Sequence, residues 1–266
     1  MLIKDFLIGG DHEVFLKDKN TNEIVSAEGI IKGTKHDPFN FDETDRFACT
    51  SLDNVLAEYN IKPSKTKAEY YHAIQKALDY IKNFIPKNLE PIAIPAARLD
   101  SKYLQTENAL LFGCERDYNA WTNQINDSPQ AEDSSLRSAG FHITLGYDNP
   151  NEIVNLMWVK AMDLYVGVPS VIQEPDNERK KLYGKAGAFR HTPFGSEYRS
   201  TSNYILQNKN LINWAFDSTV KAVEFVNNDR IFELDEESDS IISAINDKDS
   251  DKAKYLIDKF KLELAA

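Results

Sequence analysis

Four segments of the chain alternate two sets of residues with a period of two, which is typical of β-strands. They are residues 11–17, 53–61, 141–147 and 196–202. In the first segment Asp11, Glu13 and Phe15 face one way, opposite an imidazole and two aliphatic side chains. Each of the other segments also presents polar or ionisable side chains on one face: Glu58, then His142 and Thr144, then Glu197, Arg199 and Thr201.

Stretches with apolar residues three or four positions apart predict helices between and after these strands. The first helix begins at Thr66, because Glu69 three residues later completes a capping box. A second start signal lies at Asn149, where Pro and Glu follow, and we expect Gly167 and Pro169 to end that helix. Two further helical stretches are predicted at residues 203–226 and 253–262.

Strands and helices mix without a regular βαβ period, which favours an α+β fold with a largely antiparallel sheet and helices on its outer face. A length of 266 residues is near the limit for one hydrophobic core. We therefore expect one domain at residues 1–228, with residues 229–266 as an acidic segment and C-terminal helix packed on it. The carboxylates of residues 229–251 are interpreted as a solvated surface.

Composition excludes several classes of protein. The net charge of −11 argues against a surface that binds duplex DNA directly. No window of about 18 apolar residues predicts a membrane span, and 42 % apolar residues are too many for a disordered chain. Cys49 and Cys114 are too few for a disulfide framework. We expect both to be reduced and buried, and we expect a cytoplasmic protein.

The polar strand faces predict a metal site. Carboxylate oxygens with a single imidazole suit Mg²⁺ or Mn²⁺ better than structural zinc, which prefers Cys or several His ligands. Asp11 and Glu13 point the same way because they lie two residues apart on a strand. The alternative interpretation is that these groups form the solvent face of a half-exposed sheet.

A second chemical signal is a basic segment at residues 176–202 in an otherwise acidic chain. It contains glycines that favour tight turns and the cations Arg179, Lys180, Lys181, Lys185, Arg190 and Arg199. Guanidinium groups beside a metal carboxylate suit a polyphosphate. A lysine-rich surface loop explains the lysines equally well, but it explains Arg190 and Arg199 poorly. No P-loop and no dinucleotide fingerprint occurs, so a nucleotide would bind in another way.

Several blocks of sequence resemble one family. They are residues 9–16 (GGDHEVFL), 53–59 (DNVLAEY), 137–143 (RSAGFHI), 182–190 (LYGKAGAFR) and 195–200 (GSEYRS). In this order they resemble the type 2 carboxylate–amine ligases encoded mainly by tailed phages. That family is similar to γ-glutamylcysteine ligase and, more distantly, to glutamine synthetase. The resemblance extends from about residue 9 to about residue 216.

The resemblance implies a glutamine-synthetase-like catalytic domain with a curved sheet. It also implies an ATP- and Mg²⁺-dependent ligase that joins a small-molecule or peptide carboxylate to an amine through an acyl phosphate, in the cytoplasm of a phage host. Matching positions imply the metal ligands Asp11, Glu13, Glu58, His142 and Glu197. They imply nucleotide contacts by Arg179, Lys185, Arg190 and Arg199, and catalytic roles for Glu197, Arg190 and Arg199.

The chain departs from the family pattern at two positions. Thr144 stands where relatives commonly carry a second His, and His12 stands where they carry Pro. The first change leaves the number of metal ions open, as the sequence leaves the oligomeric state and the substrates open. Two alternative functions therefore remain: a phage interaction protein that binds nucleotide or is catalytically inactive, and a phosphotransferase to nitrogen on the same fold.

Overall fold

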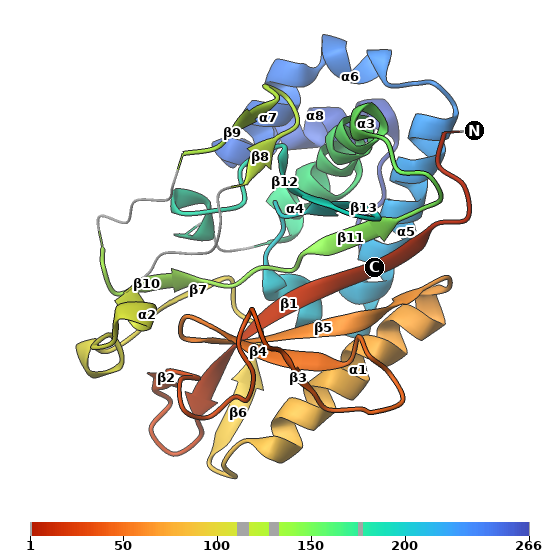
Figure 1. Cartoon of the computed structure of the whole chain (residues 1–266). Helices are drawn as coiled ribbons and strands as arrows, with labels where there is room; N and C mark the ends of the chain where they lie inside the picture. The colour runs from red at the N-terminus through yellow and green to blue at the C-terminus, as the bar shows by residue number, and fades with distance from the viewer. Residues whose placement is uncertain (1, 111–116, 128–132, 175–177, 266) are drawn as a thin grey trace.

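The computed structural model describes residues 2–110, 117–127, 133–174 and 178–265 (Figure 1). The strand predicted at residues 11–17 extends to Leu7–Asp18 and forms β1, near the middle of a large sheet. The sheet follows the order β3 (Phe39–Asn40), β4 (Cys49–Asp53), β5 (Leu56–Ser64), β1, β11 (Ile143–Gly146), β13 (Gly195–Tyr198), β12 (Ala188–Thr192), β8 (Tyr118–Asn119) and β9 (Gln124–Ile125).

Two more strands, β2 (Ile24–Val25) and β6 (Leu89–Ile92), pair with the far end of β1. A separate two-stranded sheet joins β7 (Ala96–Arg98) to β10 (Leu136–Ser138). The named strands of the described residues pair antiparallel throughout, which confirms the predicted α+β class and its largely antiparallel sheet.

The helices are α1 (Lys67–Phe84), α2 (Glu107–Leu110), α3 (Glu152–Met162), α4 (Val168–Gln173), α5 (Lys209–Asn227), α6 (Phe232–Glu236), α7 (Ser238–Asn246) and α8 (Ser250–Phe260). Short helical turns are η1 (Ser101–Tyr103), the π-helical η2 (Asp163–Gly167), η3 (Glu178–Lys181) and η4 (Asn203–Gln207). In Figure 1, α1, α3 and α5 lie along the sheet, and their apolar side chains share one core with it.

Alternation along β1 separates the core from the opposite face. Ile8, Val14 and Leu16 are buried against the helices, in a core that also holds Tyr70 of α1 and Trp158 of α3. A fully buried side chain of this size stabilises a fold by about 1.5–3 kcal/mol. The intervening residues of β1 therefore face away from the helices, as the period of two predicts.

The first predicted helix is confirmed and the second needs correction. Thr66 accepts a hydrogen bond from the Glu69 amide and completes the capping box of α1. The cap of α3 is Asn151, not Asn149, because Asn149 has a left-handed φ of 54° and turns the chain before the helix. Helical structure also continues past Gly167 into α4, since the π-turn precedes Pro169 and leaves that proline in the first turn of the next helix.

The last segments of the chain pack on the same core. Ile241 and Ile245 of α7 and Leu256 of α8 are buried in it, while carboxylates such as Asp251 face solvent. Cys49 is a free thiol but is half-buried, not buried as predicted, because β4 lies next to the short edge strand β3. Cys114 lies outside the described residues.

Candidate active site

A cleft of about 580 Å³ lies on the face of the sheet opposite the helices. It is lined by all five predicted metal-binding residues, namely Asp11, Glu13, Glu58, His142 and Glu197. Arg190 and Arg199 line it as well. The structure therefore brings together, in one concave surface, most of the ionisable side chains that the sequence singled out.

The register of the sheet explains how these side chains meet. The Cα atoms of Glu13 and Glu58 are paired across β1 and β5. Glu197 pairs with Thr144 on one side and with Arg190 on the other. Since residues opposite each other in antiparallel strands project from the same face, these five strands direct their polar side chains into the cleft.

His142 enters the cleft just before β11, and two glycines make room for it. A Cβ atom on Gly10 would lie 2.2 Å from the carbonyl oxygen of His142, and one on Gly140 would lie 2.3 Å from its Nε2. These distances are far below van der Waals contact, so both positions require glycine. The backbone N–H of His142 donates to the carbonyl of Asp11, which fixes the imidazole beside that carboxylate.

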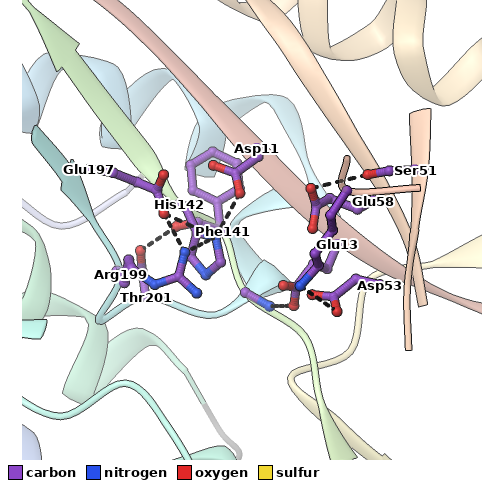
Figure 2. Close-up of polar contacts among 12 residues, drawn as sticks. Asp11, Glu13, Ser51, Asp53, Glu58, Phe141, His142, Glu197, Arg199 and Thr201 are labelled. Carbon is purple, nitrogen blue, oxygen red and sulfur yellow. Dashed lines mark hydrogen bonds and ion pairs between the residues drawn. The ribbon is translucent and has the colours of Figure 1, made fainter. Parts of the chain in front are cut away.

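We call Asp11, His142 and Glu197 the histidine cluster, because their ligand atoms all lie within 4.8 Å of one another (Figure 2). Nδ1 of His142 lies 3.2 Å from Oδ2 of Asp11 and 3.9 Å from Oε1 of Glu197. Burial and the positive charge of Arg199 hold the pKa of His142 well below its usual value. A neutral imidazole is the form that binds metal ions.

Glu13, Asp53 and Glu58 form a second group, the carboxylate cluster, whose ligand atoms also lie within 4.8 Å of one another (Figure 2). Donors that contact it include Gly140 N at 2.6 Å from Glu13, Ser51 Oγ at 3.2 Å from Glu58, and Lys35 Nζ at 2.7 Å from Asp53.

Charge is poorly balanced in the carboxylate cluster. Burial, followed by the charge of Asp53, raises the pKa of Glu13 to about 7. Burial and the neighbouring carboxylates, Asp11 first, raise the pKa of Glu58 well above its usual value. Three oxygen ligands that repel one another are suited to a divalent cation, which would compensate their charge.

Arg199 links the histidine cluster to the rest of the cleft. Its Nη1 bonds to Glu197 and lies 3.3 Å from Nδ1 of His142, and its Nε forms a 2.6 Å ion pair with Asp117. Arg190 lines the cleft beside Glu197, and its buried Nε has no hydrogen-bond partner among the described residues. A guanidinium at this position can pair with an anion that enters the cleft.

The other two predicted phosphate ligands lie elsewhere. Arg179 is buried and donates to the carbonyls of Ser200 and Arg199, at 3.2 Å each. It lines a smaller cavity of about 40 Å³ behind Glu13 and Arg199. Lys185 is exposed, with its Nζ 3.5 Å from the carbonyl oxygen of Asn246, and it lines neither cavity.

Sequence reasoning missed Asp53, which the structure adds to the site. The interpretation of residues 53–61 as one strand placed Asp53 on the face opposite Glu58. The chain instead reverses at Asn54, which has a left-handed φ of 56°, and Asp53 ends the preceding strand of a hairpin. An Asn after the acid is a signal for such a turn. For Asp117, which pairs with Arg199, the sequence offered no signal.

No helix among the described residues is long and apolar enough to cross a membrane.

Three comparisons with known proteins bear on this site. Residues 138–261 match the model of a family described as phage phiEco32-like COOH.NH2 ligase-type 2. Among solved structures, the chain is similar to a bifunctional glutathione synthetase from Pasteurella multocida, with 9 % identity and a TM-score of 0.43. That similarity covers 98 % of this chain and 49 % of the synthetase, so the chain spans about half its length. None of the curated proteins matches.

The two matches differ in what they support. The matched segment 138–261 includes His142, Arg190, Glu197 and Arg199, so the family description concerns the half of the cleft that these residues form. The similarity to the synthetase is too low to assign a fold. The glutamine-synthetase-like arrangement of the domain therefore stays a prediction.

Proposed function

We propose that the protein is a carboxylate–amine ligase that depends on ATP and on Mg²⁺ or Mn²⁺. Its catalytic unit is a glutamine-synthetase-like domain at residues 1–228, on which residues 229–266 pack. The observation that carries this proposal is the adjacency of two metal-ligating clusters and two arginines in one cleft. The family match of residues 138–261 supports the same reaction class.

The residues present suit divalent metal ions. Glu13, Asp53 and Glu58 would hold one ion through hard oxygen ligands. The raised pKa of Glu13 reflects burial and then repulsion by Asp53, both of which a cation would offset. Asp11, His142 and Glu197 would hold another through two carboxylates and a neutral imidazole. When bound, such ions neutralise phosphate charge and act as Lewis acids.

The reaction joins an acid to an amine in two displacements. A carboxylate oxygen of the acid bonds to the γ-phosphorus of ATP, and ADP leaves. The amine nitrogen then bonds to the carbonyl carbon of the acyl phosphate, inorganic phosphate leaves, and the nitrogen loses one proton. Charge spreads over the transferred phosphoryl oxygens during the first step.

The protein's own part is to position and neutralise these groups. Arg190 lines the cleft beside Glu197, and its guanidinium binds phosphate oxygens. Arg199 is held between Glu197 and Asp117, so its guanidinium stays fixed at the cleft without reorganising during the reaction. No nucleophilic Ser or Cys is needed for this chemistry.

The direct test uses hydroxylamine as a surrogate amine, because it converts any acyl phosphate to a hydroxamate. The purified protein is incubated with Mg·ATP, hydroxylamine and a panel of small-molecule and peptide carboxylic acids. We expect ADP and a hydroxamate to form in equal amounts with at least one acid. Glu197→Gln, which keeps the size of the side chain, should abolish both products.

Two results would contradict the ligase. ADP formation with a phosphorylated nitrogen and no hydroxamate would identify a phosphotransferase. Failure of the wild type to bind Mg·ATP would favour an interaction protein with an inactive site. We place the reaction in the cytoplasm of a phage host, with small-molecule or peptide substrates and without direct binding of duplex DNA.

A further inference from the structure

The cleft continues beyond both metal-ligating clusters along β1. Cross-strand pairs form successive rows on its floor, and rows are spaced by two residues, about 6.6 Å. The first row pairs Glu13 with Glu58, and the second pairs Asp11 with Asn60. The third joins Gly9, Thr144, Glu197 and Arg190.

The fourth row differs from the first three because none of its side chains is ionisable. It joins Leu7, Gly146, Gly195 and Thr192. Leu7 lies four residues from Asp11, about 13 Å along an extended strand. The metal-ligating chemistry therefore ends at the third row, although the cleft does not: Leu7, Gly9, Gly146 and Thr192 all line it.

Two glycines on neighbouring strands leave the floor without side chains at this end. A Cβ atom on Gly9 would first meet Pro63, at 3.5 Å, and one on Gly146 would first meet the ring of Phe194, also at 3.5 Å. The two rings thus flank the paired strands from opposite sides, Pro63 from β5 and Phe194 from the turn between β12 and β13. We call Gly9, Gly146, Pro63 and Phe194 the glycine slot.

Phe194 is 51 % exposed, although it lines a cleft. Its backbone is held in place, because its carbonyl accepts a hydrogen bond from the N–H of Tyr147 at 3.1 Å. An aromatic ring on a fixed backbone, exposed over a glycine, offers a face on which a planar group can stack.

We propose that the glycine slot binds the planar base of the nucleotide whose phosphates bind at the histidine cluster and the arginines. The inference rests on the proposed function, because it requires a nucleotide in the cleft. The fourth row lies about 13 Å from Asp11 along the strand, and a ribose with its triphosphate spans that distance. The phosphates then lie over the second and third rows, where the metal ligands and Arg190 are.

Charge argues against the acid substrate as the occupant of the slot. Asp5 and Asp148 line this end of the cleft, close to the fourth row in sequence, and they would repel a second carboxylate. The same oxygens accept hydrogen bonds from the exocyclic amino group of a base. A neutral, flat ligand with hydrogen-bond donors on its edge therefore fits this end of the cleft.

Comparing ATP with tripolyphosphate tests the slot, because the second ligand has the phosphates without the base. Dissociation constants for Mg·ATP and Mg·tripolyphosphate are measured by calorimetry for the wild type and Phe194→Ala. We expect the variant to bind ATP about tenfold more weakly, the change that about 1.4 kcal/mol of lost stacking produces. Its affinity for tripolyphosphate should not change.

Two further variants sharpen the test. Gly146→Leu fills the floor of the slot without needing a left-handed backbone, and it should weaken ATP binding but not tripolyphosphate binding. Phe232→Ala is the matched control, since Phe232 is 61 % exposed on α6, outside the cleft. It should bind both ligands as the wild type does, and thermal unfolding checks that every variant is folded.

The outcomes separate this inference from the proposed function. If the wild type binds ATP and Phe194→Ala binds it equally well, the base lies elsewhere and only the slot is overturned. Equal weakening of ATP and tripolyphosphate also overturns it, because the phenyl ring would then act on the phosphates. A wild type that binds neither ligand overturns both the slot and the proposed function.

Discussion

The histidine cluster and the carboxylate cluster occupy one cleft but balance charge in opposite ways. In the histidine cluster Arg199 pairs with Glu197, and the imidazole of His142 stays neutral. In the carboxylate cluster Lys35 forms an ion pair with Asp53, yet burial and the charge of Asp53 still raise the pKa of Glu13 to about 7. The charge of the histidine cluster is balanced by the protein's own groups, whereas the carboxylate cluster is stabilised by protons or by an added cation.

This difference shows how function and stability divide between the clusters. Removing a charged partner from the histidine cluster should destabilise the fold, because it leaves a buried charge uncompensated. Removing a carboxylate from the carboxylate cluster should instead relieve repulsion and weaken the binding of the divalent cation.

Arg199→Met should have the largest effect, a loss of about 3–5 kcal/mol in the free energy of unfolding. The variant keeps the length of the side chain but leaves Glu197 and Asp117 without their buried partner. Urea denaturation measures the change. Arg190→Met is the control, since Arg190 has no ion pair among the described residues, and it should lose less than about 1 kcal/mol. Equal losses in both variants would contradict the assigned role of Arg199.

Glu13→Gln should remove one contribution to the pH dependence of the free energy of unfolding. A raised pKa in the folded state means that the folded protein holds a proton that the unfolded chain releases, so stability falls as pH rises from 4.5 to about 7. At 1.36 kcal/mol per pH unit, this contribution is at most about 3 kcal/mol. We expect the variant to lose it.

Two histidines act in the opposite sense. Burial lowers the pKa of His142, and it lowers that of His12 to about 3, so both destabilise the fold as pH falls below 6.5. Without Glu13 the protein should therefore lose stability more steeply on acidification from pH 7 to 5. Urea denaturation without divalent cations measures this difference, and parallel profiles for the two proteins would refute it.

Asp163→Asn should lower the free energy of unfolding by about 2 kcal/mol, because this buried carboxylate accepts hydrogen bonds next to the histidine cluster. It accepts hydrogen bonds from Trp121 Nε1 at 2.7 Å, Gly187 N at 2.6 Å and Tyr198 OH at 2.8 Å. Tyr198 stands between Glu197 and Arg199 in the sequence. An Asn side chain turns an amino group toward at least one of these donors.

Tyr198→Phe is the matched variant for Asp163, since it removes a single one of the three bonds and should cost about 1 kcal/mol. Thermal unfolding of both variants measures the two effects. If Tyr198→Phe were as damaging as Asp163→Asn, the hydroxyl would have a further role and the support would not be shared among three segments.

Thr144→Val should have the smallest effect, within about 0.5 kcal/mol of the wild type in the free energy of unfolding. Thr144 lines the cleft opposite Glu197, but it belongs to neither cluster. The affinity for Mn²⁺, measured by calorimetry, should also be unchanged. A loss as large as that of Glu197→Gln would show that the hydroxyl binds a metal ion.

The sequence predicted the strand faces well because alternation is a local property. Asp11, Glu13 and Glu58 follow a period of two, and the structure directs all three into the cleft. The capping box of α1 is also local, since Thr66 and Glu69 are three residues apart. Such features depend on neighbouring residues alone.

Features that depend on tertiary packing escaped prediction. Asp53 joins the carboxylate cluster through a hairpin turn at Asn54, which the alternating pattern concealed. The division of the predicted metal ligands into two clusters depends on which strands pair, because Glu197 reaches Asp11 only across β11. Lys185 was grouped with the arginines by proximity in sequence, yet its backbone turn leaves it on the surface beside α7.

The most direct test of the central claim is thermal unfolding of the wild type and Asp53→Asn with and without Mg·ATP. A ligand at about 100 times its dissociation constant stabilises the folded state by about 2.7 kcal/mol, a rise of roughly 5–10 °C in Tm for a chain of this size. We predict this rise in the wild type only when Mg²⁺ is present. Asp53→Asn should match or exceed the wild-type Tm without ligand and show no rise with Mg·ATP. An equal rise in both proteins, or a rise without Mg²⁺, would contradict the claim that the carboxylate cluster holds one of the cations on which ATP binding depends.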